Sequence, residues 1–129
     1  MKTPEPTDPL QEILLRDPRY VAEAYAFVRA GLDFTVRKLK KTRHVSGGEL
    51  LDGIREFALR EFGPMTKTIL AGWGITSTED VGEIVFNMVE SGLLGKTDED
   101  SRADFAAGYD FDQAFRKPFQ PSDAPHARF

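Results

Sequence analysis

Apolar residues recur at intervals of three and four along most of this sequence, the spacing expected of helices that bury one side. A short helix is predicted from Leu10 to Arg16. Asp17-Pro18 then has the pattern of a helix start, with Asp as the N-cap and Pro at the first helical position. The apolar positions of this second helix, about twenty residues long, are Val21, Ala24, Tyr25, Val28, Leu32 and Leu39. Gly31 costs about 1 kcal/mol relative to alanine inside a helix, which a close helix crossing there would explain.

A capping-box pattern marks the start of the next predicted helix. Ser46 is followed three residues later by Glu49, the spacing at which each side chain can bond the backbone of the other. The apolar stripe that follows ends at Gly63, a residue suited to the left-handed conformation beyond a helix end. Pro64 should begin a shorter helix that ends at about Gly72.

A longer helix is predicted after the turn at Trp73-Gly74-Ile75. Ser77 provides its cap signal, Gly92 ends it, and Leu93-Leu94 should pack back on the core. Helix, short helix, turn and longer helix over about residues 49–94 predict a helix-turn-helix core, and the final Gly-Leu-Leu resembles the start of a wing in winged-helix domains. An antiparallel helical bundle gives similar patterns, so both arrangements stay open.

Aromatic residues dominate the region after the polar, acidic stretch 95–104. They are Phe105, Tyr109, Phe111 and Phe115. Their spacing predicts two short helices hinged at Gly108, with a pair of strands as the weaker alternative, so segment 93–111 could hold a wing or short helices. The predicted fold is mainly α, a single-domain helical bundle over residues 10–116 with little or no β. Residues 1–9 are expected to form a flexible arm, and residues 117–129, with three prolines, a tail.

Composition narrows the class of protein. The 129 residues include no cysteine, which excludes disulfides, thiolate metal sites and cysteine nucleophiles. No apolar run reaches the roughly 18 residues that a membrane span needs, and no secretory signal is visible, so a cytoplasmic protein without membrane association is expected. The net charge of −4 divides unevenly, into +3 over residues 1–45, −9 over 46–115 and +2 over 116–129.

The placement of charge bears on nucleic-acid binding. The predicted helix 78–91 would read DNA in a helix-turn-helix protein, yet residues 76–92 contain four carboxylates and no Lys or Arg. DNA affinity depends on cations that neutralise phosphates, so binding through this helix is disfavoured. A nucleic-acid-associated regulator remains the alternative hypothesis through a separate basic segment, whose candidate anion-binding residues are Arg37, Lys38, Lys40, Lys41, Arg43 and His44.

Few features of the sequence are typical of catalysis or metal binding. The sequence holds no nucleophile elbow, phosphate loop, dinucleotide fingerprint or zinc-protease motif. His44 and Glu49 could form an acid–base pair, which is the second alternative. The acidic run from Asp98 fails the calcium-loop template because Arg102 occupies the third ligand position. We therefore predict no catalytic residues, no cofactor and no metal site.

Several motifs together resemble a small family of uncharacterised bacterial proteins associated with the planctomycete–verrucomicrobial group. The motifs are Arg43-His44-Val45-Ser46-Gly47-Gly48-Glu49-Leu50-Leu51, Phe62-Gly63-Pro64, Trp73-Gly74-Ile75, Glu83-Ile84-Val85-Phe86-Asn87 and Tyr109-Asp110-Phe111. The resemblance covers roughly residues 20–115 and implies a bacterial cytoplasmic protein of this size. It implies no activity, cofactor or functional residue.

The function predicted from these observations is a non-enzymatic protein-interaction module. It would bind an unidentified protein partner through its acidic helical face, its aromatic C-terminal segment, or both. The candidate contact residues are Glu79, Glu83, Asn87, Glu90, Tyr109 and Phe111. Oligomeric state and biological role are left open by the sequence.

Overall fold

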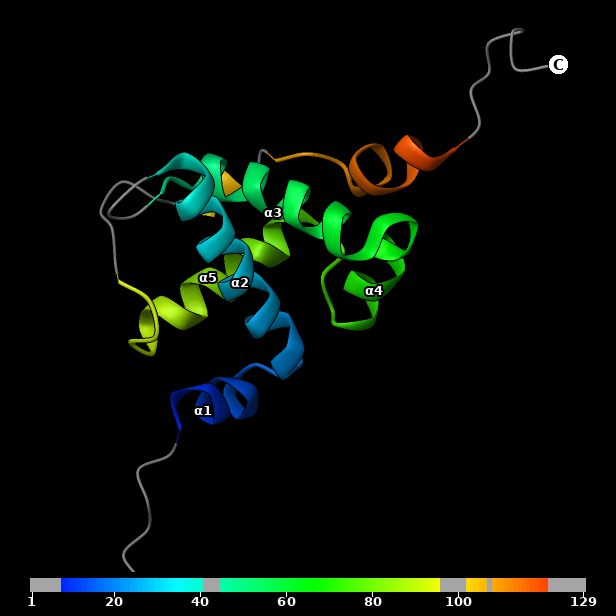
Figure 1. Ribbon diagram of the computed structural model, residues 1–129. Helices are drawn as coiled ribbons and strands as arrows, with labels where there is room; N and C mark the ends of the chain where they lie inside the picture. The colour runs from blue at the N-terminus through cyan, green and yellow to red at the C-terminus, as the bar shows by residue number, and fades with distance from the viewer. Residues whose placement is uncertain (1–7, 41–44, 96–101, 107, 121–129) are drawn as a thin grey trace, which may run out of the picture.

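The computed structural model describes residues 8–40, 45–95, 102–106 and 108–120, and these residues are mainly helical, without any strand (Figure 1). The α-helices are α1 (Pro9–Arg16), α2 (Ala22–Leu39), α3 (Gly47–Phe62), α4 (Thr66–Gly72), α5 (Thr78–Glu90) and α6 (Arg102–Ala106). The described residues also form short helical turns of other types. They are the 3-10 turns η1 (Gly63–Met65) and η3 (Lys117–Phe119) and the π-helical turn η2 (Asp112–Arg116). The prediction of a helical domain is confirmed.

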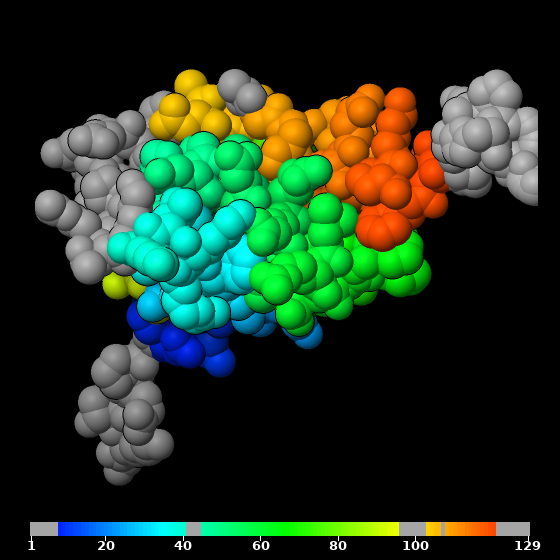
Figure 2. All heavy atoms as spheres, turned by 45° about the horizontal axis from the view of Figure 1, so that its top comes forward, coloured from blue at the N-terminus to red at the C-terminus, as the bar shows by residue number. Residues whose placement is uncertain are grey.

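The helices pack around one hydrophobic core. α2 lies along α3 in the most extensive helix pair, and α5 contacts α2, α3 and α6. α1 contributes Ile13 to the core, and the C-terminal aromatics reach it from the opposite end of the chain. Figure 2 shows the C-terminal segment against the region of α3 and α4, where Lys67 of α4 forms an ion pair with Asp112 of η2. No described helix has the length and apolar character required to cross a membrane.

Two glycines set the distance between α2 and α3. A Cβ atom placed on Gly31 would lie 2.7 Å from Cγ1 of Ile54, so the expected close crossing at Gly31 is confirmed. On the other helix, a Cβ on Gly53 would lie 1.7 Å from Oγ1 of Thr35, which is buried. Atoms at either distance overlap, so the two helix backbones approach as closely as they do because both positions lack a side chain.

Most predicted helix ends are confirmed. The Ser46 hydroxyl accepts a hydrogen bond of 3.1 Å from the Glu49 N–H, and the Glu49 carboxylate accepts one of 2.9 Å from the Ser46 N–H. Gly92 follows α5 with φ +79°, where glycine carries no Cβ penalty. Gly63 ends α3 as predicted, but with φ +53° and ψ −132° it lies outside the left-handed helical region that was expected for it. Ser77 begins α5 through a second capping box, with Asp80.

The predicted helix start at Asp17-Pro18 is wrong. Asp17 instead ends α1, where its N–H donates to the Ile13 carbonyl at 2.8 Å, and α2 begins only at Ala22. Proline disfavours the helical conformation in the residue before it, which suits Asp17 to a helix end. The Asp17 carboxylate accepts hydrogen bonds from the backbone N–H of Arg19 at 3.2 Å and from the side chains of Arg19 and Asn87, none of which belongs to the first turn of α2.

The aromatic segment forms two short helical pieces, as predicted. α6 and η2 lie on either side of Gly108, and Phe105, Phe111 and Phe115 are all buried. Phe111 and Phe115 meet edge to face with ring centroids 4.9 Å apart, a favoured geometry for aromatic pairs. The alternative of a strand pair is not what the described residues 102–106 and 108–120 adopt.

Candidate functional site

A network of hydrogen-bonded side chains connects α5 to the segment between α1 and α2. The Asp17 carboxylate accepts hydrogen bonds from Nε and Nη2 of Arg19, at 2.8 and 2.6 Å, and from Nδ2 of Asn87 at 3.0 Å. Arg19 Nη2 also reaches Oε1 of Glu83 at 3.2 Å. The Asn87 amide donates as well to the hydroxyl of Tyr25 at 3.0 Å. This α1–α5 network therefore fixes residues that lie about seventy positions apart in the chain.

A second hydrogen-bonded pair extends the contact. The Tyr20 hydroxyl donates to Oδ1 of Asp80 at 2.5 Å, and the other oxygen of Asp80 accepts from the N–H of Thr76 at 2.9 Å. Tyr20 is buried and Asp80 is half-buried. The cap of α5 and the link before α2 are thus held by the same carboxylate.

The network moves pKa values away from neutrality. Hydrogen bonds from Arg19 outweigh burial and hold the pKa of Asp17 well below its ordinary value, while the same pairing raises the pKa of Arg19. Burial, with the hydrogen bond to Asp80, raises the pKa of Tyr20. Burial alone would raise the pKa of Asp80, but the hydrogen bonds from Tyr20, Thr76 and Ser77 lower it overall. Each group keeps one charge state throughout the neutral range.

Replacing Asp17 with asparagine is expected to lower the free energy of unfolding by about 1–2 kcal/mol at pH 7, because charge-assisted bonds are lost. Arg19 is more than half exposed, so solvent screening limits the loss. Since the folded-state pKa of Asp17 is lowered, its contribution is complete above the unfolded pKa of about 4 and disappears as the pH falls further. The difference between the two proteins should therefore shrink in acid.

Urea denaturation of both proteins at pH 7 and below pH 4 measures this difference. Asp52→Asn is the matched control, since Asp52 is exposed on α3 and has no part in the α1–α5 network. An equal loss in both variants, or a difference that grows in acid, would contradict the role given to Asp17.

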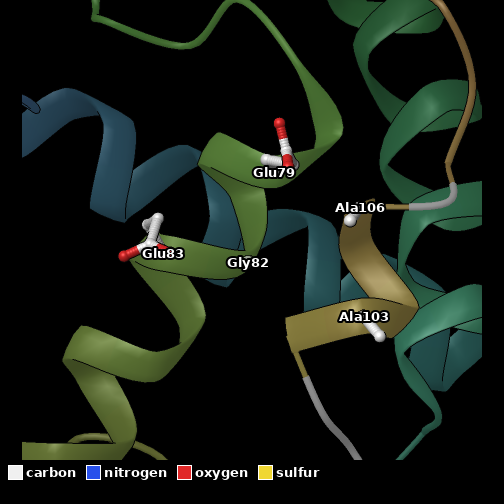
Figure 3. A pocket seen from close by; sticks show the side chains of 5 residues that line it. All are labelled: Glu79, Gly82, Glu83, Ala103 and Ala106. Atoms are coloured by element: carbon white, nitrogen blue, oxygen red, sulfur yellow. The ribbon is translucent and has the colours of Figure 1, made fainter.

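A shallow hollow of about 260 Å³ lies between α5 and α6. It is lined by Glu79, Gly82, Glu83, Ala103 and Ala106 (Figure 3). Figure 3 shows the alanines on α6 and the glutamates on α5, with the Glu83 side chain turned away from α6. Glu79 is exposed and makes no ion pair with any described residue. The hollow therefore has a small-residue lining and an acidic edge.

The predicted contact residues separate into two groups in the structure. Glu79 and Glu90 are exposed and Glu83 is half-buried. Asn87 and Phe111 are buried, so neither adds to the exposed surface. Tyr109 is half-buried, its hydroxyl donates to the Leu51 carbonyl at 2.7 Å, and burial raises its pKa. The acidic helical face is present at the surface, whereas the aromatic segment is mainly core.

The basic candidates are described in part. Arg37, Lys38 and Lys40 are exposed in the last turn of α2 and at its end. Lys38 pairs with Glu56, while Arg37 and Lys40 make no ion pair within the part of the chain that the structure describes. Lys41, Arg43 and His44 lie outside the described residues. The pair of His44 with Glu49 therefore stays a prediction, and the Glu49 carboxylate is engaged in the cap of α3.

Neither a metal-binding cluster among the described residues nor a similarity to known proteins indicates a further site. The described residues contain no group of three or more His, Asp or Glu side chains placed to hold a metal ion. No protein family, no curated protein and no solved structure matches the chain. The resemblance to a planctomycete–verrucomicrobial family stays a prediction.

Proposed function

We propose that the chain is a non-enzymatic protein-interaction module that binds its partner at the hollow between α5 and α6. The observation that carries this proposal is the combination of a small-residue lining with an exposed carboxylate that has no ion-pair partner in the described structure, Glu79. A partner segment with a Lys or Arg side chain beside a small apolar residue fits both features. Glu83, already bonded to Arg19, supports the negative potential at the edge.

The pKa directions favour a binding role over acid–base catalysis. A general acid or base works best with a pKa near the working pH. The described carboxylates with lowered pKa values and tyrosines with raised ones are shifted the other way, by bonds that hold the fold together. These groups are better suited to fixing α1 and α5 than to moving protons.

We also propose that α3, α4 and α5 form a helix-turn-helix-like unit. The short helix α4 is followed by a turn over residues 73–77 and by α5, the order that such units share. In this reading α5 is the recognition helix, and its exposed Glu79 and Glu90 would repel phosphate. The unit therefore fits a protein partner better than DNA.

Site-specific photocrosslinking tests the proposed surface. A photoreactive amino acid at Ala103 and, separately, at Ala106 should give the same adduct in a lysate of the cells that make the protein. Ala71 is the control position, because it is exposed on α4 and does not line the hollow. Glu79→Lys should reduce the adduct several-fold, as a buried or edge charge of the wrong sign repels a cationic partner.

The matched charge control is Glu61→Lys, at an exposed position on α3. The proposal fails if no adduct forms at Ala103 or Ala106, if Ala71 gives the same adduct, or if Glu61→Lys reduces it as much as Glu79→Lys.

A further inference from the structure

The end of α2 is capped by a lysine in the left-handed conformation, whose N–H bonds the carbonyls of Arg37 and Val36, bonds that a glycine could make equally well. Lys40 has φ +56° and is the one residue other than glycine with a positive φ in the described ranges. The left-handed conformation brings Cβ close to the following carbonyl oxygen, so side-chain-bearing residues rarely adopt it. The Lys40 side chain is exposed, so no burial offsets this strain.

Other helix ends in the same protein use glycine. Gly92 follows α5 with φ +79°, and Gly63 follows α3 with φ +53°, although its ψ of −132° differs from the ψ of 35° at Lys40. A glycine at position 40 would make the same turn without strain. Strain without a packing benefit points to a role for the side chain itself. A cation also suits the negative end of a helix dipole, and this purely structural reason is separated from a binding role by the experiment below.

The surroundings of Lys40 favour an anionic ligand. Arg37 and Lys40 have no ion-pair partner among the described residues. Lys38 is exposed beside them and pairs with Glu56 of α3, so a phosphate bound at Lys38 has to replace that carboxylate. Glu83 lies near the opposite end of α2, where it bonds Arg19. The length of α2, about 27 Å at 1.5 Å per residue, exceeds the Debye length of about 8 Å at physiological salt. The carboxylates around Glu83 therefore cancel little of the positive potential here, whereas Glu56 offsets part of the charge of Lys38.

We propose that Arg37, Lys38 and Lys40 bind the phosphate backbone of a nucleic acid without selecting bases. This surface is separate from the hollow between α5 and α6, and the proposal does not depend on the function assigned to that hollow. Several cations on one helical turn suit a ligand with regularly spaced phosphates. A membrane surface fits less well, because Leu39 is the one exposed large apolar residue in this turn and an interfacial helix buries a whole apolar face.

Salt titration of the full chain with a labelled DNA duplex and a labelled RNA strand tests the proposal. Three phosphate contacts predict that log K falls against log salt with a slope of about −3 for the duplex and about −2 for the single RNA strand. Lys40→Gly should weaken binding several-fold at low salt and reduce the slope by about 1. The same substitution should leave the melting temperature unchanged or raise it, because it relieves the strained φ.

Two further variants complete the design. Arg37→Ser should weaken binding as Lys40→Gly does. Arg116→Ser removes one positive charge from η2, on the far side of the molecule from the end of α2 (Figure 1), and should leave binding unchanged. The proposal is overturned if neither nucleic acid binds at low salt, if Arg116→Ser weakens binding equally, or if Lys40→Gly lowers the melting temperature without affecting binding. Preference for anionic lipid vesicles over both nucleic acids would also overturn it.

Discussion

Truncating Phe105 to alanine is expected to lower the free energy of unfolding by about 3–5 kcal/mol, the usual cost of removing a buried phenylalanine. Phe105 is 2% exposed, and its ring meets that of Phe86 edge to face at 5.9 Å. Two glycines make room for it: a Cβ on Gly82 would lie 2.7 Å from Phe105, and one on Gly47 would lie 3.3 Å from its ring. A cavity at this point is enclosed by α3 and α5, whose backbones cannot easily close it.

The loss should also release α6. A helix of five residues has no stability of its own in water, since nucleation costs more than one turn of hydrogen bonds returns. Besides the Phe105 ring, the hydrogen bond of 2.5 Å from the Thr78 hydroxyl to the Phe105 carbonyl holds α6 against α5. Faster amide exchange in α6 than in α5 should therefore accompany the lower stability.

Urea denaturation with Phe119→Ala as the matched control measures the effect. Phe119 is 45% exposed in η3, so its truncation should cost less than about 0.5 kcal/mol. Similar small losses in both variants would show that Phe105 does not anchor the C-terminal segment.

Local chemistry made the helix ends predictable. Ser46 with Glu49, and Gly63 and Gly92, report on backbone groups within a few residues, and all four mark helix ends in the structure, although Gly63 does so outside the left-handed helical region. Asp17 has an equally clear local pattern, and its carboxylate does accept a hydrogen bond from the backbone N–H of Arg19, yet the side chains of Arg19 and, from α5, Asn87 also bind it. A local start signal does not reveal a partner such as Asn87, which only the packing of α5 supplies.

The candidate site was predictable in charge and less so in geometry. The acidic character of residues 76–92 is visible in the sequence, and Glu79 and Glu90 are indeed at the surface. Asn87 is polar and belongs to the same stretch, yet it is buried because Asp17 and Tyr25 satisfy its amide. The periodicity of α5 alone cannot predict that Asn87 is buried, because its partner Asp17 precedes α2 and its partner Tyr25 belongs to α2.

The hollow itself had one indirect signal in the sequence. Gly82, Ala103 and Ala106 read as ordinary small residues, and their relation depends on how α6 lies against α5. That placement follows from Phe105, which the sequence marked only as one of four aromatic residues. The signal that could have drawn attention to it is Gly82, a glycine inside an otherwise apolar helical pattern, which indicates close approach of another element.

Replacing Gly53 with alanine is expected to destabilise the protein by about 3 kcal/mol, at the upper end of the usual cost of overpacking. The added methyl group would lie 1.7 Å from Oγ1 and 2.7 Å from Cβ of Thr35. Rotation of the Thr35 side chain cannot relieve the second contact, because Cβ is fixed to the backbone. The helices must therefore move apart, against a core that tolerates little displacement.

Helix propensity would favour the Gly53→Ala substitution, so a loss of stability cannot be attributed to propensity. Alanine is favoured over glycine inside a helix by about 1 kcal/mol, so an isolated α3 would gain from the substitution. Gly48→Ala is the matched control in the same helix: nothing lies within 4 Å of the added Cβ, and this variant should be unchanged or slightly more stable. Denaturant titration of both variants separates the crossing from propensity, and a stable Gly53→Ala would refute the close approach.

The double variant Thr35→Gly/Gly53→Ala tests the contact itself. It adds a methyl group on α3 and removes the Thr35 side chain of α2 that this methyl group would meet. Thr35→Gly alone should be destabilising, since it removes a buried side chain whose hydroxyl donates to the Gly31 carbonyl at 2.7 Å. If the two positions compete for one space, the double variant should lose less stability than the sum of the single variants. Additive losses would mean that each substitution acts on its own helix, and the spacing of α2 and α3 would then have another cause.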